Sequence, residues 1–489
     1  MSVRSAAVWA MVAQYTSFAI QFATSVVISR LFLSPAEVGL FSIALAAGML
    51  VAILQDFGLS RYIAALPRLG STDIARCSSV AMVFSLLVAG VIAASAWPLA
   101  QFYHQPALTA IMLIIAASYL FTPLAVVPLA LMSRAMQFRG HFVVTVGGTA
   151  IQAAVAITLA AAGYSSFALA WSTLACAAAR GLIAQALRPA PPWPLTLSGL
   201  RPVIDFGTRS STLYLTGALG TRSPDLILGK VLGLHAVGLY GRAISLSDQF
   251  RTLIAGAIGS VFFPAFARIR DRGEPLGPAY LRVCSGYSAV VWPGMVGLAL
   301  ASEPLVRLLY GEAWLRTAPL LTMIALTEVM LIALPLVSDL PILLGRLNRL
   351  LVFNLIDTTL SIALLAIGCL WGVEGAAASR LVYGAAWLAL YFGFMHRLVG
   401  FDAGALLRIY LRSAAATLAA VLPLAATYLF WAPPATIGLG PLFAATLAGG
   451  LCWLIALALT RHPALAEITA LAAALPIGPL RRYLAGAAA

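Results

Sequence analysis

Long apolar runs bounded by arginines are the feature that most constrains the fold of this chain. A helix needs about 20 apolar residues to cross the hydrocarbon of a bilayer. The 489 residues hold fourteen candidate runs, and no stretch long enough for a sizeable soluble domain lies between them. With 62% hydrophobic and 9% charged residues, the composition also excludes an ordinary soluble protein. We therefore predict an all-α, polytopic membrane protein.

The distribution of basic residues predicts how these spans are oriented. The spans are predicted over residues 7–31, 37–60, 77–98, 107–133, 141–162, 165–187, 203–220, 236–262, 280–300, 317–339, 350–370, 374–395, 405–431 and 437–460. Arg30, Arg282, Arg408 and Arg412, which lie toward the ends of spans, are counted with the adjoining segments. If the N-terminus is cytoplasmic, 20 of the 30 basic residues then fall on the cytoplasmic side, 5 on the outer side and 5 within spans. Because cytoplasmic loops carry the excess of Lys and Arg, we expect both termini in the cytoplasm.

Several classes of chemistry find no support in the sequence. The five cysteines and five histidines are scattered singly, without the spacing of metal ligands. No phosphate-binding Gly-x-x-x-x-Gly-Lys-Ser/Thr motif occurs. The basic residues separate apolar runs and form no patch suited to nucleic acid, and the first span is too long for a cleaved signal peptide. We expect no cofactor, no nucleic-acid partner and no enzymatic activity.

A short motif occurs twice, 199 residues apart. Val38-Gly-Leu-Phe41 and Val237-Gly-Leu-Tyr240 each begin an apolar span. Six predicted spans lie between them, so both halves have the same orientation, as in transporters with parallel repeats. The proline-rich residues 188–202 cannot continue a helix. We predict an N-lobe over 1–187, a cytoplasmic linker over 188–202, a C-lobe over 203–398, and two further spans with a cytoplasmic tail over 399–489.

Polar side chains within the spans are the candidate site residues, because an ionisable group there costs about 2.5–3.5 kcal/mol on insertion scales. Gln14, Ser17, Gln21 and Thr24 follow one another at steps of three or four, and so share one helical face. Such a face lines a water-filled cavity or bonds neighbouring helices. We predict that Gln14 and Gln21 bind substrate.

Arginines within or at the ends of the spans are candidate ligands for a phosphate, because the guanidinium group binds phosphate oxygens in a bidentate manner. The predicted set is Arg61, Arg209, Arg242 and Arg251. The pairs Asp205–Arg209 and Asp248–Arg251 have the helical spacing of ion pairs, so mutual neutralisation is the alternative. Arg61 could equally be a topology anchor.

Acidic side chains are candidates for coupling transport to H+ or Na+. The predicted set is Asp56, Asp248, Glu328 and Asp339. Glu328 and Asp339 are placed on one predicted helix, about 16 Å apart, with Pro335 as the site of a kink. Pairing of these acids, and of Asp357, with cations such as Arg380 is the alternative. For Asp56, the alternative is a charge at the membrane interface.

Four sequence blocks together resemble a known family. They are Arg30–Phe41 followed by Asp56-Phe-Gly-Leu-Ser60; Val237-Gly-Leu-Tyr-Gly-Arg-Ala243; Phe263-Pro-Ala-Phe-Ala-Arg268; and Leu309-Tyr-Gly-Glu-Ala-Trp314 followed by Ala318-Pro-Leu-Leu321. Their order and spacing are similar to those of the polysaccharide-transport flippases, which export O-antigen and exopolysaccharide and belong to the multidrug/oligosaccharidyl-lipid/polysaccharide (MOP) superfamily. The final two spans carry no block of this kind.

The resemblance implies an architecture and a function. The expected fold has two pseudo-symmetric six-helix lobes around a central cavity, plus two C-terminal helices. The expected activity is alternating-access transfer of undecaprenyl-pyrophosphate-linked oligosaccharide across the bacterial inner membrane for surface polysaccharide synthesis. A polymerase and glycosyltransferases are the expected partners.

Two other functions remain open at this point. An ion-coupled drug/cation antiporter of the same superfamily is the nearer one, but it should favour acids and aromatics over arginines in its cavity. A membrane glycosyltransferase or polymerase generally needs a sizeable outer loop, and the longest outer stretch here is about residues 221–235.

Overall fold

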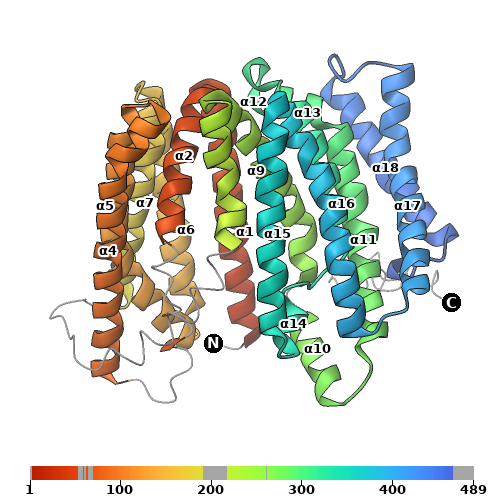
Figure 1. The fold of residues 1–489 in the computed structure, drawn as a ribbon, viewed down its shortest axis with the longest axis horizontal. Coiled ribbons are helices and arrows are strands. Elements are labelled where there is room, and N and C mark those ends of the chain that lie inside the picture. The colour runs from red at the N-terminus through yellow and green to blue at the C-terminus, as the bar shows by residue number, and fades with distance from the viewer. Residues whose placement is uncertain are drawn as a thin grey trace. The chain divides into compact units, whose positions relative to one another are not determined.

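Every regular element of the described residues is a helix (Figure 1). The computed structural model describes residues 3–52, 59, 62–63, 70–190, 217–259 and 262–465. Within these residues, ten helical stretches are long and apolar enough to cross a membrane. One of them, Leu347–Val399, holds two consecutive helices. The predicted all-α membrane architecture is confirmed, and the total of fourteen spans stays a prediction.

The chain divides into two compact units. Unit 1 comprises Met1–Gly241 with Leu309–Ala313, and unit 2 comprises Arg242–Leu308 with Trp314–Ala489. The lobe, linker and tail boundaries that the sequence predicts stay predictions, and most of the linker, residues 191–202, lies outside the described residues.

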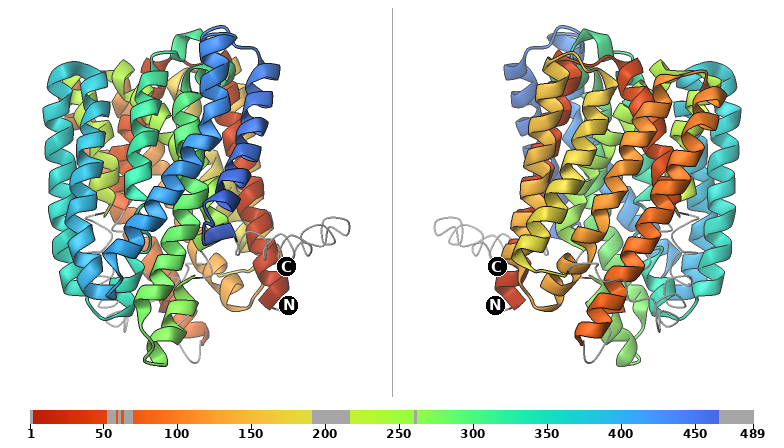
Figure 2. Two further views of the ribbon diagram at one scale, coloured as in Figure 1. Left: turned by 90° about the vertical axis from the view of Figure 1, so that its right-hand side faces the viewer. Right: turned by 90° about the vertical axis from the view of Figure 1, so that its left-hand side faces the viewer.

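Unit 1 is a bundle of long helices. Its labelled members are α1 (Val3–Leu31), α2 (Pro35–Ala52), α4 (Ser71–Tyr103), α5 (Ala107–Arg134), α6 (Phe138–Ala161) and α7 (Ser166–Leu187). Contacts run from α4 to α5, from α5 to α7, from α7 to α6 and from α6 to α1, while α2 packs on α5 (Figure 2, right). Residues 217–231 are also helical and precede α9 (Leu234–Gly259), which crosses the boundary between the units.

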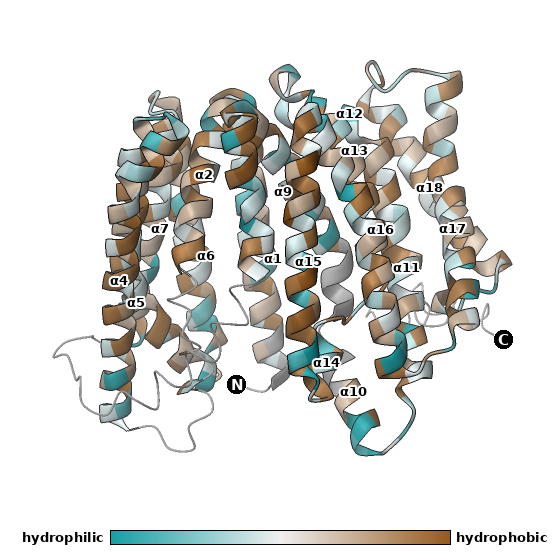
Figure 3. Ribbon diagram, in the orientation of Figure 1, coloured by the Kyte–Doolittle hydropathy of each residue, from teal (hydrophilic) through white to brown (hydrophobic). Residues whose placement is uncertain are grey.

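Unit 2 holds the rest of the labelled helices. They are α10 (Phe262–Asp271), α11 (Leu276–Leu300), α12 (Ser302–Tyr310), α13 (Thr317–Leu331), α14 (Asp339–Leu343), α15 (Leu347–Gly368), α16 (Gly372–Val399), α17 (Ala403–Phe430) and α18 (Leu439–Leu459). Within it, α16 packs on both α13 and α15, and α11 packs on α13 and α17. Figure 3 shows apolar residues along the middles of these helices and hydrophilic residues at the end that carries α10 and α14.

The turn between α16 and α17 shows why the sequence stops one helix and begins the next. Gly400 has a φ of +72°, a left-handed conformation that glycine adopts at low cost, and its N–H bonds the His396 carbonyl. Two residues later, the Asp402 carboxylate accepts a hydrogen bond from the Gly404 N–H at 2.9 Å. An aspartate at this position caps a helix N-terminus. The predicted spans 374–395 and 405–431 therefore end and begin within four residues of the observed bounds.

The predicted helix 317–339 is wrong at its C-terminal end. The structure ends α13 at Leu331, and Asp339 begins the separate five-residue helix α14. Pro335 lacks an N–H and disfavours helical backbone before it, and the following Leu336 has a φ of +59°. Glu328 and Asp339 thus do not share a helix.

The predicted end of the span 203–220 is also wrong. Residues 201–216 lie outside the described residues, but 217–231 are helical, so Arg222 and Lys230 lie on a helix and not in an outer loop. Lys230 Nζ donates a 2.6 Å hydrogen bond to the Phe102 carbonyl, and Tyr103 Oη donates a 3.0 Å bond to the Leu226 carbonyl. Phe102 lies in the last turn of α4, where the carbonyls have no partner within the helix. Lys230, a charged residue that marks a loop by hydropathy, therefore bonds the C-terminal end of α4.

The two copies of the repeated motif lie against each other in unit 1. A Cβ added to Gly39 would stand 1.9 Å from the Leu234 carbonyl oxygen, and one added to Gly238 would stand 1.8 Å from the Pro35 carbonyl oxygen. Leu234 precedes Gly238 by four residues, as Pro35 precedes Gly39. Each glycine thus approaches the same point of the other repeat. Such reciprocity is the mark of a two-fold relation, and only glycine permits the approach.

A buried chain of hydrogen bonds joins the last helices of the chain to α11. His462 Nδ1 accepts from the Ala464 N–H at 3.2 Å, so the proton on the ring lies at Nε2, which donates to Ser413 Oγ at 2.9 Å. Ser413 lies 2.8 Å from Ser288 Oγ, which donates to the Cys284 carbonyl at 2.7 Å. His462 is 2% exposed, and burial lowers its pKa below the ordinary value of 6.5, with the nearby Arg412 acting in the same direction.

Candidate functional site

A polar pocket in unit 1 brings the predicted stripe of the first helix together with an arginine. Gln14, Ser17 and Gln21 of α1 line a cavity of about 480 Å³, which α6 and α7 complete with His141, Thr145 and Arg180. Thr24, the fourth member of the stripe, is not among the lining residues; its hydroxyl bonds the Ile20 carbonyl at 2.7 Å. The shared helical face that the sequence predicts is therefore observed for three of its four residues.

Arg180 lies across α6 because a glycine leaves room for it. A Cβ on Gly148 would stand 2.3 Å from Arg180 Cγ, so any larger residue there would displace the side chain. Arg180 Nη2 donates to Thr149 Oγ1 at 3.1 Å, while its Nε is buried without a hydrogen bond. Within the described part of the chain, no carboxylate forms an ion pair with Arg180. Placing a cation with so few partners inside an apolar span costs free energy. Binding of an anion would reduce that cost, so Arg180 is suited to an anionic ligand.

The lining of this pocket suits a phosphorylated sugar. A guanidinium group matches the oxygens of a phosphate, and the amides of Gln14 and Gln21 can each donate to and accept from a hydroxyl. His141 Nδ1 and Thr145 Oγ1 are already paired at 3.3 Å. Phe18 and Phe138 add apolar surface to the lining.

Unit 2 holds a cluster of charges on α9 and α13. Arg251 Nη2 donates to Asp248 Oδ1 at 2.7 Å, and Arg251 Nε lies 3.3 Å from Glu328 Oε2. The Glu328 side chain is 13% exposed and those of Arg251 and Asp248 are 39% and 53% exposed. The predicted i,i+3 pair is thus present, and Arg251 is also neutralised by a second acid. This arrangement favours the ion-pair alternative for Arg251.

A second polar group lies between α15 and α16. Tyr383 Oη donates to Asp357 Oδ1 at 2.8 Å, and Arg380 Nη1 donates to Ser361 Oγ at 3.4 Å. The Arg380 guanidinium carbon lies 4.8 Å from the centre of the Tyr383 ring, within the range of a cation–π contact. Asp357 is therefore bonded to a tyrosine, and the direct Asp357–Arg380 pair considered from sequence is not formed.

Arg242 and Arg251 do not converge on one point. The Arg242 guanidinium carbon lies 5.3 Å from the centre of the buried Trp314 ring, in the block Leu309–Trp314. Arg251 lies nine residues further along α9, about 13.5 Å of helical rise, and contacts Glu328. Stacking on an aromatic ring gives Arg242 a packing role beside its predicted role in binding.

Three predicted site residues, Asp56, Arg61 and Arg209, lie outside the described residues, as does Asp205. Asp339 is exposed at the first residue of α14, beyond the end of α13. None of the assigned binding or coupling roles is tested by the structure.

Arg180 is absent from the predicted site, although the sequence shows it inside an apolar span. Arg180 is identified by two features together: it has no described carboxylate partner, and it packs on Gly148 of the neighbouring helix. The contact with Gly148 is visible only in three dimensions. Among the described residues, no group of three or more His, Cys, Asp or Glu could hold a metal ion.

Comparison with solved structures supports the fold. The lipid II flippase MurJ, in an inward closed conformation, superimposes with a TM-score of 0.74 at 15% identity, over 92% of this chain and 98% of MurJ. The two chains share a fold at little sequence identity. The predicted class, a polytopic helical membrane transporter fold, is thus confirmed.

Comparison with protein families identifies the group to which the sequence belongs. The succinoglycan biosynthesis transport protein ExoT of Rhizobium meliloti (strain 1021) is 24% identical over 325 residues, 65% of each chain. The lipopolysaccharide biosynthesis protein WzxC of Escherichia coli (strain K12) is 26% identical over 173 residues, 35% of each chain. The matched segments thus span less than two thirds of each relative. The family described as "Polysaccharide biosynthesis protein" matches residues 27–319, more than half of the chain. The resemblance predicted from sequence is confirmed, and the chain belongs to this family of polysaccharide biosynthesis proteins.

Proposed function

We propose that this protein transports undecaprenyl-pyrophosphate-linked oligosaccharide from the cytoplasmic to the periplasmic leaflet of the bacterial inner membrane, for the synthesis of a surface polysaccharide. The observation that carries the proposal is Arg180, an in-span cation without a described acidic partner, which opens into a polar pocket beside Gln14 and Gln21. The names of ExoT and WzxC, which refer to transport in succinoglycan biosynthesis and to lipopolysaccharide biosynthesis, point the same way.

The physical obstacle is the desolvation of a charged, sugar-bearing head group over about 30 Å of hydrocarbon. Arg180 would replace water around a phosphate, and the amides of α1 would replace water around sugar hydroxyls. The prenyl tail needs no such replacement, since it can stay in the lipid. Alternating access of the site to the two leaflets, as in other transporters built from repeats, would complete the transfer.

The charge cluster of unit 2 is the proposed coupling element. Asp248 and Glu328 both contact Arg251, so a proton or Na+ arriving at either acid would compete with the arginine. A change of partner at this point is a means of linking ion binding to conformation. In this proposal the protein is not an enzyme, both termini are cytoplasmic as the arginine distribution indicates, and a polymerase and glycosyltransferases act on its substrate before and after transport.

Complementation of a deletion strain tests the proposal. Deletion of the gene should abolish production of the surface polysaccharide, and lipid-linked repeat units should accumulate on the inner leaflet. The wild-type gene should restore export. An Arg180→Ala gene should restore about 10- to 100-fold less export, because a charge-assisted hydrogen bond is worth about 1.5–3 kcal/mol. Arg139→Ala is the matched control, since Arg139 is exposed on α6 and does not line the pocket.

Two results would contradict the proposal. One is normal surface polysaccharide in a deletion strain without a second family member. The other is a deletion strain that exports polysaccharide but becomes sensitive to cationic dyes, which would favour the drug/cation antiporter. Protein levels in the membrane fraction should be equal for both arginine variants.

A further inference from the structure

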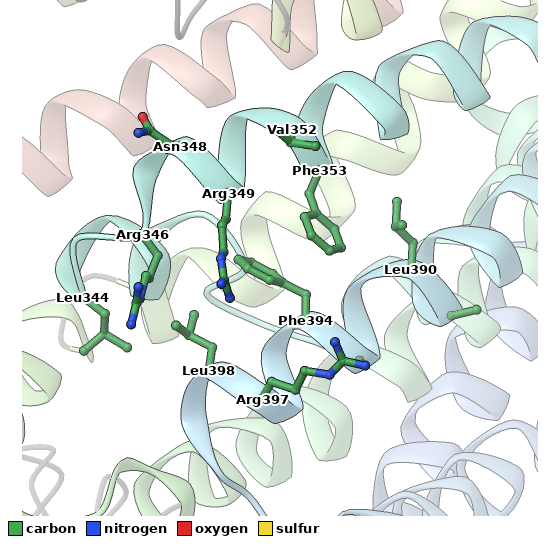
Figure 4. A pocket seen from close by; sticks show the side chains of 12 residues that line it. Leu344, Arg346, Asn348, Arg349, Val352, Phe353, Leu390, Phe394, Arg397 and Leu398 are labelled. Atoms are coloured by element: carbon green, nitrogen blue, oxygen red, sulfur yellow. The ribbon is translucent and has the colours of Figure 1, made fainter.

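A second pocket, separate from the site described above, lies between α15 and α16 of unit 2. It measures about 1040 Å³, and three arginines line it: Arg346 and Arg349 at the start of α15, and Arg397 near the end of α16 (Figure 4). All three are exposed. Their guanidinium groups make no hydrogen bond or ion pair with any described residue, so the pocket gathers three positive charges without a counter-ion from the resolved helices.

Apart from Asn348, the rest of the lining is apolar. Phe353 of α15 and Phe394 of α16 stack with their ring centres 4.5 Å apart, and Val352, Leu390 and Leu398 also line the pocket. Figure 4 shows Phe394 and Leu398 between the arginines, and Val352, Phe353 and Leu390 further to the right. The pocket is thus amphipathic, because three cationic side chains share it with a largely apolar wall.

The apolar part of the lining continues into surface that hydrocarbon would cover. Val352 is 56% exposed, and Leu355 and Ile356, one turn further along α15, are 58% and 46% exposed. Exposed apolar side chains on a spanning helix face acyl chains. The arginines lie at the end of unit 2 that carries α10 and α14, where hydrophilic residues gather (Figure 3). The hydrophilic ends of spanning helices are expected at the depth of the lipid head groups.

We propose that this pocket binds an anionic phospholipid, with the phosphate held by Arg346, Arg349 and Arg397 and an acyl chain lying along Phe353, Phe394 and Val352. Arginine forks match phosphate oxygens, and basic pockets between helices at the cytoplasmic face recognise anionic head groups. Binding of a zwitterionic phospholipid is disfavoured, because its positively charged ammonium group would lie close to the three positively charged arginines. This lipid site is independent of the transport activity proposed above.

Native mass spectrometry of the full-length protein in detergent tests the site. Dioleoyl phosphatidylglycerol should form a bound adduct at concentrations where dioleoyl phosphatidylcholine does not. The triple variant R346Q/R349Q/R397Q should lose the adduct, with each arginine changing affinity about 5-fold. Gly393→Phe should also lose it without any change of charge, because a Cβ at Gly393 meets nothing within 4 Å and the new ring would fill the pocket.

Matched controls separate the pocket from a general effect of charge or of bulk. R268Q/R272Q/R282Q removes three exposed arginines from the same unit but outside the pocket, and Gly90→Phe adds a ring at an open position of α4. Both should keep the adduct. Equal binding by the pocket variants and their controls would overturn the proposal. So would equal binding of the two lipids, or displacement of phosphatidylglycerol by millimolar inorganic phosphate, which would assign the arginines to a free anion.

Discussion

Alanine at Gly39 or Gly238 would test the contact between the two repeats. The new Cβ would stand 1.9 Å or 1.8 Å from a carbonyl oxygen, whereas a carbon and an oxygen in contact lie about 3.3 Å apart. The helices α2 and α9 would have to separate by roughly 1.4 Å at this point. Overpacking lowers the free energy of unfolding by about 1–3 kcal/mol. We expect a loss near the upper end of this range, because the opposing atom belongs to the backbone and cannot rotate away.

The reciprocity of the contact makes a sharper prediction for the double variant. Gly39→Ala and Gly238→Ala require the same separation of α2 from α9, so the second substitution should add little once the first has been made. We expect either single variant to lower the free energy of unfolding by about 3 kcal/mol, and the double variant to lower it by nearly the same amount. Independent sites would give a loss of roughly 6 kcal/mol in the double variant.

Thermal unfolding of the purified protein, followed by the exposure of its cysteines to a thiol-reactive dye, measures these changes. Gly90→Ala and Gly450→Ala are the controls, since a Cβ at either meets nothing within 4 Å; each should leave stability equal or improve it by about 0.5–1 kcal/mol. Single variants as stable as these controls, or a double variant with the full sum of the two losses, would refute the reciprocal contact.

Three further predictions follow from single contacts. Gly148→Ala should reduce export as far as loss of Arg180 does, because its Cβ takes the space of the Arg180 side chain. Arg251→Met should destabilise the protein by about 1–3 kcal/mol, because it leaves the largely buried Glu328 carboxylate without its ion-pair partner, and adding Glu328→Met should recover much of that loss. The free energy of unfolding should fall as the pH drops below about 6.5, by up to about 1.4 kcal/mol per unit, because the fold holds His462 neutral while the unfolded chain takes up a proton.

Each of these predictions has its own control. Export by Gly90→Ala should match wild type in the same complementation assay, and full export by Gly148→Ala would contradict the assigned position of Arg180. The two single variants and the double variant at Arg251 and Glu328 form a double-mutant cycle. If the double variant loses the sum of the two single losses in stability, the two side chains do not interact, and the prediction is wrong. For the pH dependence, His462→Gln can form the same two hydrogen bonds without titrating; a pH profile identical to that of wild type would remove His462 as the cause.

The sequence predicts which segments span the membrane better than it predicts the residue at which each helix ends. Hydropathy placed the cores of most described helices, because an apolar run of sufficient length has few alternatives in a bilayer. It failed at Pro335, where the missing N–H ends α13 inside an otherwise apolar run, and at Lys230, where a charge is accommodated by the Phe102 carbonyl. In the first case a local backbone requirement ends the helix, and in the second a contact with another helix accommodates a charge; mean hydropathy reports neither.

The site was less predictable than the fold. Helical spacing was sufficient for the stripe of Gln14, Ser17 and Gln21, because it depends on one helix alone. It was also sufficient for the Asp248–Arg251 pair, but it could not show that Arg251 also reaches Glu328 on another helix. Arg180 acquires its position from Gly148, 32 residues away in sequence. Partners of this kind depend on packing, which a single sequence does not specify.

The His462–Ser413–Ser288 hydrogen bonds have a consequence for how the C-terminal pair of helices behaves. Trp453 of α18 and Tyr428 of α17 also bond carbonyls of α11, those of Ala289 and Leu300, at 2.8 Å and 3.2 Å. Sliding α17 past α11 would break the buried Ser413–Ser288 bond and the Tyr428 bond, and sliding α18 past α11 would break the Trp453 bond. During any rearrangement α17 and α18 should therefore move with α11 as one rigid block.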